Sequence, residues 1–328
     1  MELNTKGKAY ALAEYLKSHD LISIKDDVDA HYHDLKNNFI GLALFSEDHP
    51  SLPLVSVAIY CCVAQRLGLD AHPCGFPFHV LAIVRPPVGQ SADGRDLESD
   101  SEWGKQWIYM DPFRSSTEAL QSDLTAQLVS MGVPQNAHAS LLDISSTTAV
   151  VQRSAKNIIT SVQTLHRGNG VASNGSTLDV DSAFYAALLT LVILDEGNTE
   201  PRMMGIRRGR YVPYLLKLLH GPFPLDVCMI RDYIIPLFES AQDGGELRDG
   251  LEALLLNDST PKVVKERSPE ALTAVQYKVG QIFHHKRYHY RAAIVGWDVQ
   301  CAASEDWMSQ MGVHNLPRGR YQSFYHAL

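Results

Sequence analysis

The sequence has few cysteines: five in 328 residues, at positions 61, 62, 74, 228 and 301. An odd number of cysteines, mostly in apolar surroundings, predicts reduced thiols rather than a disulfide framework, and so a protein of the cytoplasm or nucleus. Long apolar runs are also missing, since no segment approaches the eighteen or so apolar residues of a membrane span. The N-terminus lacks the apolar core of a signal peptide. We therefore expect no membrane partner.

Positive charge is scarce as well. The chain has 29 Lys and Arg against 37 Asp and Glu, a formal net charge of −8. A chain of this charge has no general attraction for nucleic acid, so any DNA binding must come from a local basic patch. The apolar fraction of 45% and the charged fraction of 20% are typical of globular proteins. The length allows two or three domains.

The stretch from Ser51 to Gly68 organises the N-terminal part of the chain. Pro53 suits the first turn of a helix, and the residues after it are apolar on nearly every side until Gly68. A helix without a polar face is buried all round, so this stretch predicts the central helix of a domain. We expect a strand over 75–84 that carries His79, and a later strand over 106–112.

This order of elements resembles the core of the transglutaminase-like, papain-like superfamily. Within it, the Pro-led helix, Arg-Leu-Gly at 66–68 and Phe-Pro-x-His at 76–79 resemble the SirB1-type branch. In active relatives a Cys begins the helix, followed by a His and an Asp, which here correspond to the histidine of 76–79 and to Asp111. The Cys position falls at Leu54 or Val55, and neither is a nucleophile. The resemblance therefore implies a pseudoenzyme with a relic His–Asp pair and no catalytic residue.

Cysteine- or serine-type acyl transfer stays as an alternative. Such chemistry needs a nucleophile poised near a histidine and a helix N-terminus. Ser56 is the hydroxyl nearest the empty position. Cys61 and Cys62 lie about 10 Å further along the helix, and an extended chain would hold Cys74 about 16 Å from His79.

Between residues 7 and 45 the pattern is helical. Residues 7–18 predict an amphipathic helix with Leu12 and Leu16 on one face. His31 and His33 would share one side of an extended strand and could hold a metal, but no Cys or spaced carboxylate accompanies them. We favour the alternative, in which polar residues lead into a core helix over 39–45.

The middle of the chain is mostly helical. Residues 87–105 are acidic and rich in turn formers, which predicts a mobile loop. Residues 115–142 predict helix, and apolar residues recur at helical spacing over 184–192 and 212–219. A flexible loop is expected over 168–175, and the basic cluster 207–210 is interpreted as a solvated surface.

The C-terminal part has a different character. A strand over 277–285, a turn over 286–290 and a second strand over 291–298 predict a hairpin. With Trp307 and the segment 321–326, this hairpin resembles the YccV/HspQ family, known as the hemimethylated-DNA-binding domain. The family fold is a small, strongly bent β-barrel with two more strands beyond the last segment. We therefore expect a barrel that is truncated.

The same module is locally basic. From residue 277 to 328, six Lys and Arg against three Asp and Glu give a charge of +3. Basic and aromatic residues together can contact phosphates and stack on bases, although a bent barrel also needs aromatic residues in its core. The predicted ligand-binding residues are Lys286, Arg287, Tyr288, Tyr290, Arg291, Trp297, Tyr325 and His326.

Taken together, the sequence predicts an α+β protein. Its layout is a SirB1-type transglutaminase-like domain over 1–145, a helical region over 146–260, a linker over 261–276 and a YccV-like barrel over 277–328. This architecture resembles the eukaryotic F-box only protein 21-like family. The resemblance implies that the chain recruits a protein substrate to an SCF ubiquitin ligase, with the Skp1-docking F-box outside this chain. DNA is the alternative partner, and no cofactor or metal is expected.

Overall fold

The structure is a computed structural model that describes residues 3–25, 27–77, 79–98, 106–167, 178–194, 208–238, 243–261, 268–286 and 289–328. The chain divides into two compact units, Met1–Ser259 and Thr260–Leu328. The first combines a sheet with many helices, and the second is built on a smaller sheet. The overall class is thus α+β, as predicted.

The sheet of the first unit has four strands that pair antiparallel in chain order: β1 (Asp70–Cys74), β2 (Leu81–Arg85), β3 (Ile108–Met110) and β4 (Glu118–Ala119). Cys74 lies opposite Leu81, so the chain reverses direction between them. The predicted strand over 75–84 is therefore wrong in its first half, where the structure has a connection that holds His79.

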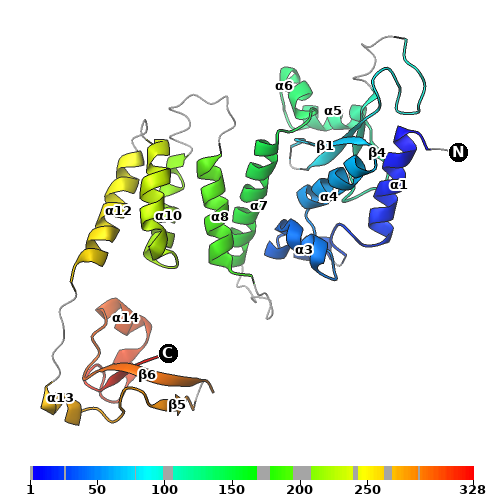
Figure 1. Cartoon of the computed structure of the whole chain (residues 1–328). Coiled ribbons are helices and arrows are strands. Elements are labelled where there is room, and N and C mark those ends of the chain that lie inside the picture. Colours follow the sequence, from blue (N-terminus) through cyan, green and yellow to red (C-terminus); the bar gives the residue numbers. More distant parts are fainter. Residues whose placement is uncertain are drawn as a thin grey trace. The chain divides into compact units, whose positions relative to one another are not determined.

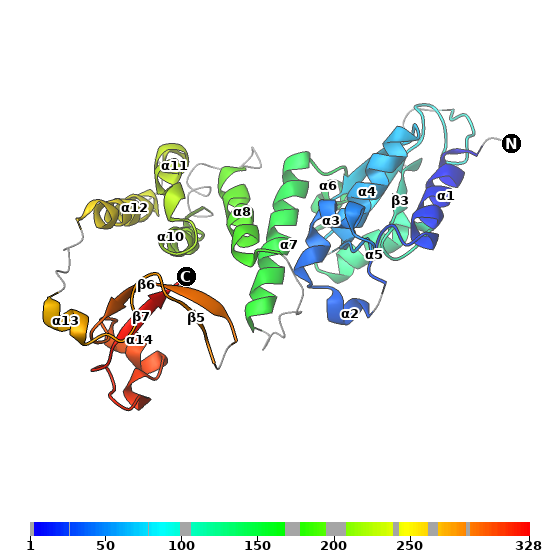
Figure 2. The same ribbon diagram turned by 60° about the horizontal axis from the view of Figure 1, so that its bottom comes forward.

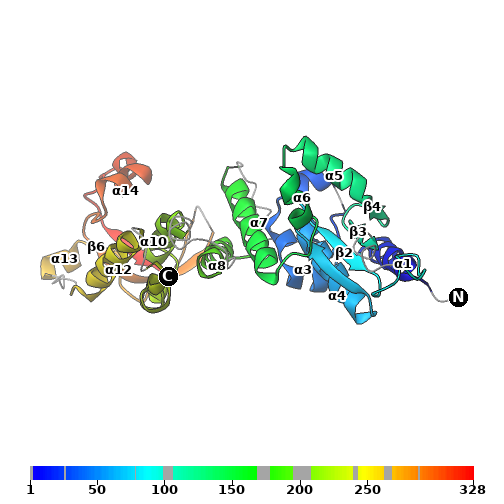
Figure 3. The ribbon, with the colours of Figure 1, turned by 90° about the horizontal axis from the view of Figure 1, so that it is seen from above.

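Helices cover both faces of this sheet (Figure 3). Ala82 and Val84 face a core formed with α1 (Thr5–Ser18) and α4 (Pro53–Arg66). Leu81 and Ile83, which alternate with them, face a second core formed with α5 (Gln121–Ser130). Side chains of a strand alternate between its two faces, so each face of β2 is buried in one of the two cores.

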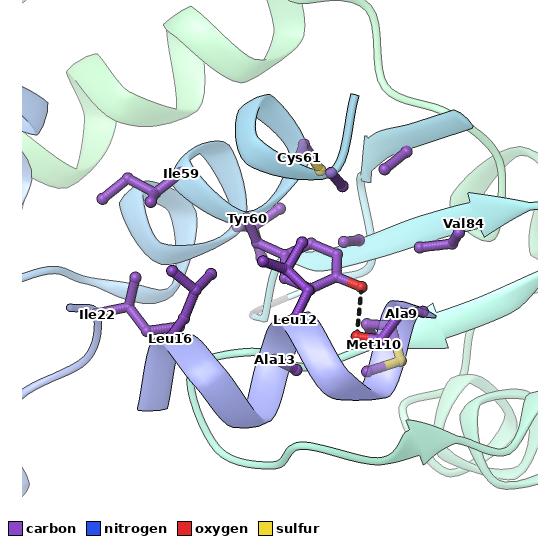
Figure 4. Packing of buried hydrophobic residues seen from close by; sticks show 14 of the residues in the cluster. Ala9, Leu12, Ala13, Leu16, Ile22, Ile59, Tyr60, Cys61, Val84 and Met110 are labelled. Carbon is purple, nitrogen blue, oxygen red and sulfur yellow. Dashed lines mark hydrogen bonds between the residues drawn. The ribbon is translucent and has the colours of Figure 1, made fainter. Parts of the chain in front are cut away.

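Helix α4 begins as the sequence predicts, with Pro53 in its first turn. It ends where Gly68 adopts a φ of 78°, which favours glycine. The first half is buried on all sides, whereas Cys62 in the second half is exposed, so the prediction of burial all round is only partly correct. The hydroxyl of Tyr60 donates to the carbonyl of Ala9 over 3.0 Å and ties α4 to α1 (Figure 4).

Further helices complete the first unit. They are α2 (Val28–His31), η1 (Leu35–Asn38), α3 (Ile40–Phe45), α6 (Gln135–Leu141), α7 (Thr147–Arg167), α8 (Val180–Ile193), α10 (Val212–His220), η3 (Pro224–Asp226), α11 (Val227–Met229), η4 (Ile230–Ile234), η5 (Ile235–Phe238) and α12 (Asp243–Ser259). The pairs α7 with α8 and α10 with α12 pack side by side (Figure 1). The predicted helices over 7–18, 184–192 and 212–219 are confirmed by α1, α8 and α10.

Several predictions need correction here. The helix α3 is not a core helix, because only Ala43 is buried and Phe45 is 89% exposed. Arg208 is not a solvated charge, since its guanidinium donates to the carbonyls of Val192 and Leu237, each at 2.8 Å. Residues 87–98 of the predicted mobile loop form a turn closed by a bridge between Gln90 and Asp96. The predicted loop over 168–175 lies outside the described residues.

The second unit has a three-stranded antiparallel sheet in the order β5 (Ile282–His284), β6 (Arg291–Asp298) and β7 (Phe324–Ala327), seen in Figure 2. Its helices are α13 (Pro269–Thr273), α14 (Glu305–Gln310) and η6 (Val313–Asn315). The first predicted strand is shorter than expected because Gly280 turns the chain at a φ of 89°. Helix α13 lies within the segment predicted as a linker.

Candidate functional site

His79 and Asp111 meet at one edge of the first sheet. His79 precedes β2 and Asp111 follows β3. These strands run antiparallel with Ala82 opposite Met110, so His79 and Asp111 lie close together. The imidazole Nε2 is 2.7 Å from Asp111 Oδ2, and the two side chains are only 11% and 12% exposed. The backbone N–H of Arg114 donates to the other carboxylate oxygen over 3.1 Å. Both oxygens of Asp111 are therefore held in place.

This pair has the geometry of an oriented base. The carboxylate binds one ring nitrogen, and the ring of Phe113 packs against the imidazole at an angle of 63°, with centroids 6.3 Å apart. A histidine held in this way can take a proton from a nucleophile and return it. Within the described part of the chain, however, no Ser, Thr or Cys side chain hydrogen-bonds to His79.

The start of α4 carries no nucleophile. Leu54 and Val55 are buried in the core, with 5% and 6% of their surface exposed. Ser56 is fully buried, and its hydroxyl lies 2.8 Å from that of Ser51. The backbone N–H of Ser23 donates to both hydroxyls, over 2.7 Å and 3.3 Å. These serines join an earlier segment to the helix, so the structure gives Ser56 a structural use.

The nearby thiols are held in their neutral form. Burial raises the pKa of Cys61 well above its usual range, and burial raises the pKa of Cys74 to about 11. Cys74 is directed to the carbonyl of Leu141, 3.5 Å away. The 16 Å separation expected for Cys74 and His79 assumed an extended chain, which the reversal between β1 and β2 rules out. A protonated thiol is a poor nucleophile, whatever its distance.

A cavity of about 550 Å³ opens beside the start of α4. We call it the Arg153 cavity; its lining residues are Tyr32, Leu54, Cys74, Gly75, Val80, Ser145, Ala149, Val150, Arg153, Lys156 and Asn157. Leu54 marks the empty nucleophile position, and Val80 directly follows His79. The ring of Tyr32 packs edge-on against Phe113, which in turn packs against His79. The cavity therefore lies next to the His–Asp pair.

The two histidines considered for a metal do not lie on a strand. His31 ends the short helix α2 and pairs with Asp34 over 3.0 Å, and His33 packs against the ring of Tyr32. The chain turns here because Asp27 caps α2 by accepting from the backbone of Ala30. No group of three or more His, Cys, Asp or Glu that could hold a metal occurs among the described residues.

In the second unit, two of the residues predicted to bind a ligand have structural roles instead. Trp297 is only 6% exposed, so it does not offer a ring for stacking. The hydroxyl of Tyr325 accepts from the backbone N–H groups of Gln276 and Tyr277, over 2.9 Å and 3.2 Å. Tyr325 thus fastens the beginning of the module to its last strand, which is a structural task.

Other predicted residues do lie at the surface. Lys286 and Arg291 are exposed near the hairpin end, and Tyr290 stacks on His285 with centroids 5.0 Å apart. His326 is 62% exposed and lies 3.0 Å from Asp298. The remaining two, Arg287 and Tyr288, lie outside the described residues.

Comparison with known protein families gives a match within each unit. Residues 3–156 match the model described as the transglutaminase-like superfamily, and residues 275–328 match the one described as hemimethylated DNA-binding protein YccV like. The chain joins a transglutaminase-like domain to a YccV-like domain. The resemblances to the transglutaminase-like superfamily and to the YccV-like family are confirmed. In the transglutaminase-like domain, Leu54 and Val55 are aliphatic at the helix start, where the sequence resemblance implies a nucleophile.

Curated relatives match most of the chain. F-box only protein 21 from Pongo abelii, Mus musculus and Homo sapiens is in each case 27% identical over 285 residues, which is 84% of this chain. The chain spans 40% or 41% of the length of these relatives. No solved structure matches the chain. Among the described residues, no helix is both long and apolar enough to span a membrane.

The sequence patterns missed the residues that complete the site in the transglutaminase-like domain. Tyr32 and Arg153 come from segments far from the motif, and Phe113 follows Asp111 by two residues. Arg153 lies on α7 between the buried residues Gln152 and Ala155, and a positive charge at such a position was the one indication of a site.

Proposed function

We propose that this chain is a non-catalytic protein-interaction region that recruits substrates to an SCF-type ubiquitin ligase in the cytoplasm or nucleus. The similarity to F-box only protein 21 over most of the chain supports this role. The observation that carries the non-catalytic part is that Leu54 and Val55 stand at the helix start where the family pattern requires a nucleophile. Docking on Skp1 would come from an F-box outside these residues.

The proposed layout has one recognition region in each unit. A transglutaminase-like domain over 1–145 and a helical region over 146–260 precede a YccV-like module over 277–328, whose three strands are proposed to form part of a small bent barrel. In the first domain, no described side chain supplies the buried His–Asp pair with a nucleophile, and a cavity lies beside the pair. Such a cavity is suited to binding.

The test joins the chain to an F-box and reconstitutes the ligase. We expect a protein captured by the chain to be ubiquitinated only when the F-box is present. His79→Ala should leave capture unchanged once the variant is shown to be folded, and His220→Ala, at the exposed end of α10, is the matched control. Covalent labelling of one residue by an acyl-directed probe, lost in His79→Ala, would instead identify an enzyme.

DNA binding is the second candidate. The match of residues 275–328 to a family described as hemimethylated DNA-binding favours it. The exposed cations Lys286 and Arg291 near the hairpin end would contact phosphates. The burial of Trp297 weakens the case for base stacking.

Fluorescence anisotropy with hemimethylated and unmethylated duplexes over a range of salt concentrations tests this candidate. If DNA is the ligand, Lys286→Glu and Arg291→Glu will weaken binding and each will reduce the salt slope by about one. Lys217→Glu on α10 carries the same charge change at an exposed position outside the module. Equal weakening by all three variants would point to net charge rather than a site.

A further inference from the structure

The Arg153 cavity has the size of a ligand site. Its volume of about 550 Å³ falls in the range of about 300–1,000 Å³ that small-ligand pockets occupy. Its walls come from the start of α4, from the connection between β1 and β2, and from α7. All of these elements belong to the first unit.

Arg153 brings a half-buried positive charge to this cavity. Its Nη1 donates to the carbonyl of Phe76 over 2.9 Å, and burial lowers the pKa of its guanidinium. A guanidinium has five N–H donors, and no carboxylate of the described residues pairs with this one. Two other arginines show how a guanidinium is usually satisfied, by a carboxylate or by several carbonyl groups. Arg85 donates to Asp70 over 2.7 Å, and Arg208 donates to two carbonyls.

The other walls indicate what kind of anion fits. Leu54, Val80, Ala149 and Val150 make one part of the lining apolar, while the exposed Lys156 adds a second positive charge. A carboxylate matches the planar fork of a guanidinium and binds it through two parallel hydrogen bonds. The apolar wall would take a hydrocarbon group next to that carboxylate, whereas a fully charged phosphate would face it without partners.

We infer that the Arg153 cavity binds a carboxylate carried on a small apolar group, and that this is the C-terminal end of a protein partner. The protein source rests on the proposed recruiting function. A free carboxylic acid has the same chemistry, so the test must separate the two sources.

Isothermal titration calorimetry of the whole chain provides the test. The probes are acetyl-Ala-Ala-Leu with a free carboxylate, the same peptide as its amide, and 4-methylpentanoate. We expect the acid peptide to bind about 10- to 100-fold more tightly than the amide, which is the worth of a charge-assisted hydrogen bond. Equal binding of acid and amide, or no binding of the acid, would overturn the inference. Tighter binding of 4-methylpentanoate than of the acid peptide would overturn the protein source.

Variants identify the residue responsible. Arg153→Met should remove the preference for the acid, and Arg153→Lys should keep part of it because the charge remains but the fork is lost. Arg231→Met is the matched control, since Arg231 is exposed and pairs with the neighbouring Asp232. Unchanged acid preference in Arg153→Met would refute the assignment.

Substitution of Arg153 also removes its hydrogen bond to the carbonyl of Phe76 and could destabilise the fold. A second variant therefore tests the cavity while keeping Arg153. Ala149→Phe would fill the cavity and leave Arg153 in place, so it must lose acid binding too. The ubiquitination assay is separate from these titrations. If the chain binds the acid peptide but recruits no substrate, the ligand site is supported and the proposed function is refuted. If it recruits a substrate but does not bind the acid peptide, the proposed function is supported and the ligand site is refuted.

Discussion

Two histidine–carboxylate pairs in this protein lie in different surroundings. In the transglutaminase-like domain, His79 and Asp111 are 2.7 Å apart with 11% and 12% of their side chains exposed. In the YccV-like domain, His326 and Asp298 are 3.0 Å apart with 62% and 21% exposed. Water screens an exposed pair, whereas a buried group that loses its partner stays desolvated without compensation. Exposure, rather than distance, therefore decides what each pair contributes.

The largest effect expected from this comparison is on stability. His79→Ala should lower the free energy of unfolding by about 2–4 kcal/mol, because the buried Asp111 would lose its partner. His326→Ala should lower it by less than about 1 kcal/mol. Denaturant-dependent hydrogen exchange of peptides from β3 and β7 would follow the two units separately. Equal losses would show that the burial of the pair does not matter.

Buried and exposed thiols should likewise differ in how they make stability depend on pH. Burial raises the pKa of Cys74 to about 11, above the value of about 9 expected when the thiol is in water. Because the folded state holds the proton more tightly, this stabilisation is complete below pH 9 and is lost as the pH rises towards 11. The loss should be about 2–3 kcal/mol. Cys74→Ala should flatten the alkaline slope, and Cys62→Ala should not.

The smallest effect concerns thiol accessibility. Cys62 and Cys228 are exposed, whereas Cys61, Cys74 and Cys301 are buried. A maleimide should therefore label two of the five thiols in the native protein, and Cys62→Ser should change the free energy of unfolding by less than about 0.5 kcal/mol. Mass spectrometry of digested samples identifies the labelled sites. Early labelling of Cys74 would contradict the buried environment described for it.

The elements around the His–Asp pair were largely predictable, because Pro53 and Gly68 mark the ends of α4 by their backbone chemistry. The reversal between β1 and β2 was not predicted, since an apolar run looks the same as one strand or two. Pro77 was the available signal, because proline cannot donate to a sheet and is rare within a central strand. The position of His79 before β2, rather than within it, follows from that turn.

The orientation of Trp297 could not be read from the sequence. Ala292 and Ile294 are buried, so strict alternation would place residue 296 inside and Trp297 outside. The pairing with β7 shifts between Ile294 and Gly296, and this irregularity changes which side chains face the core. The cavity was equally hidden, since Tyr32 and Arg153 meet only through the folded chain.

The hydrogen bond from Tyr60 to Ala9 bears on how the protein can be divided. Removing the first eighteen residues would take away one side of the core and leave the buried hydroxyl of Tyr60 without a hydrogen-bond acceptor. A protease that cut after Ser18 would thus damage the whole domain rather than trim an appendage. Any shorter version intended for recombinant expression has to begin ahead of Thr5.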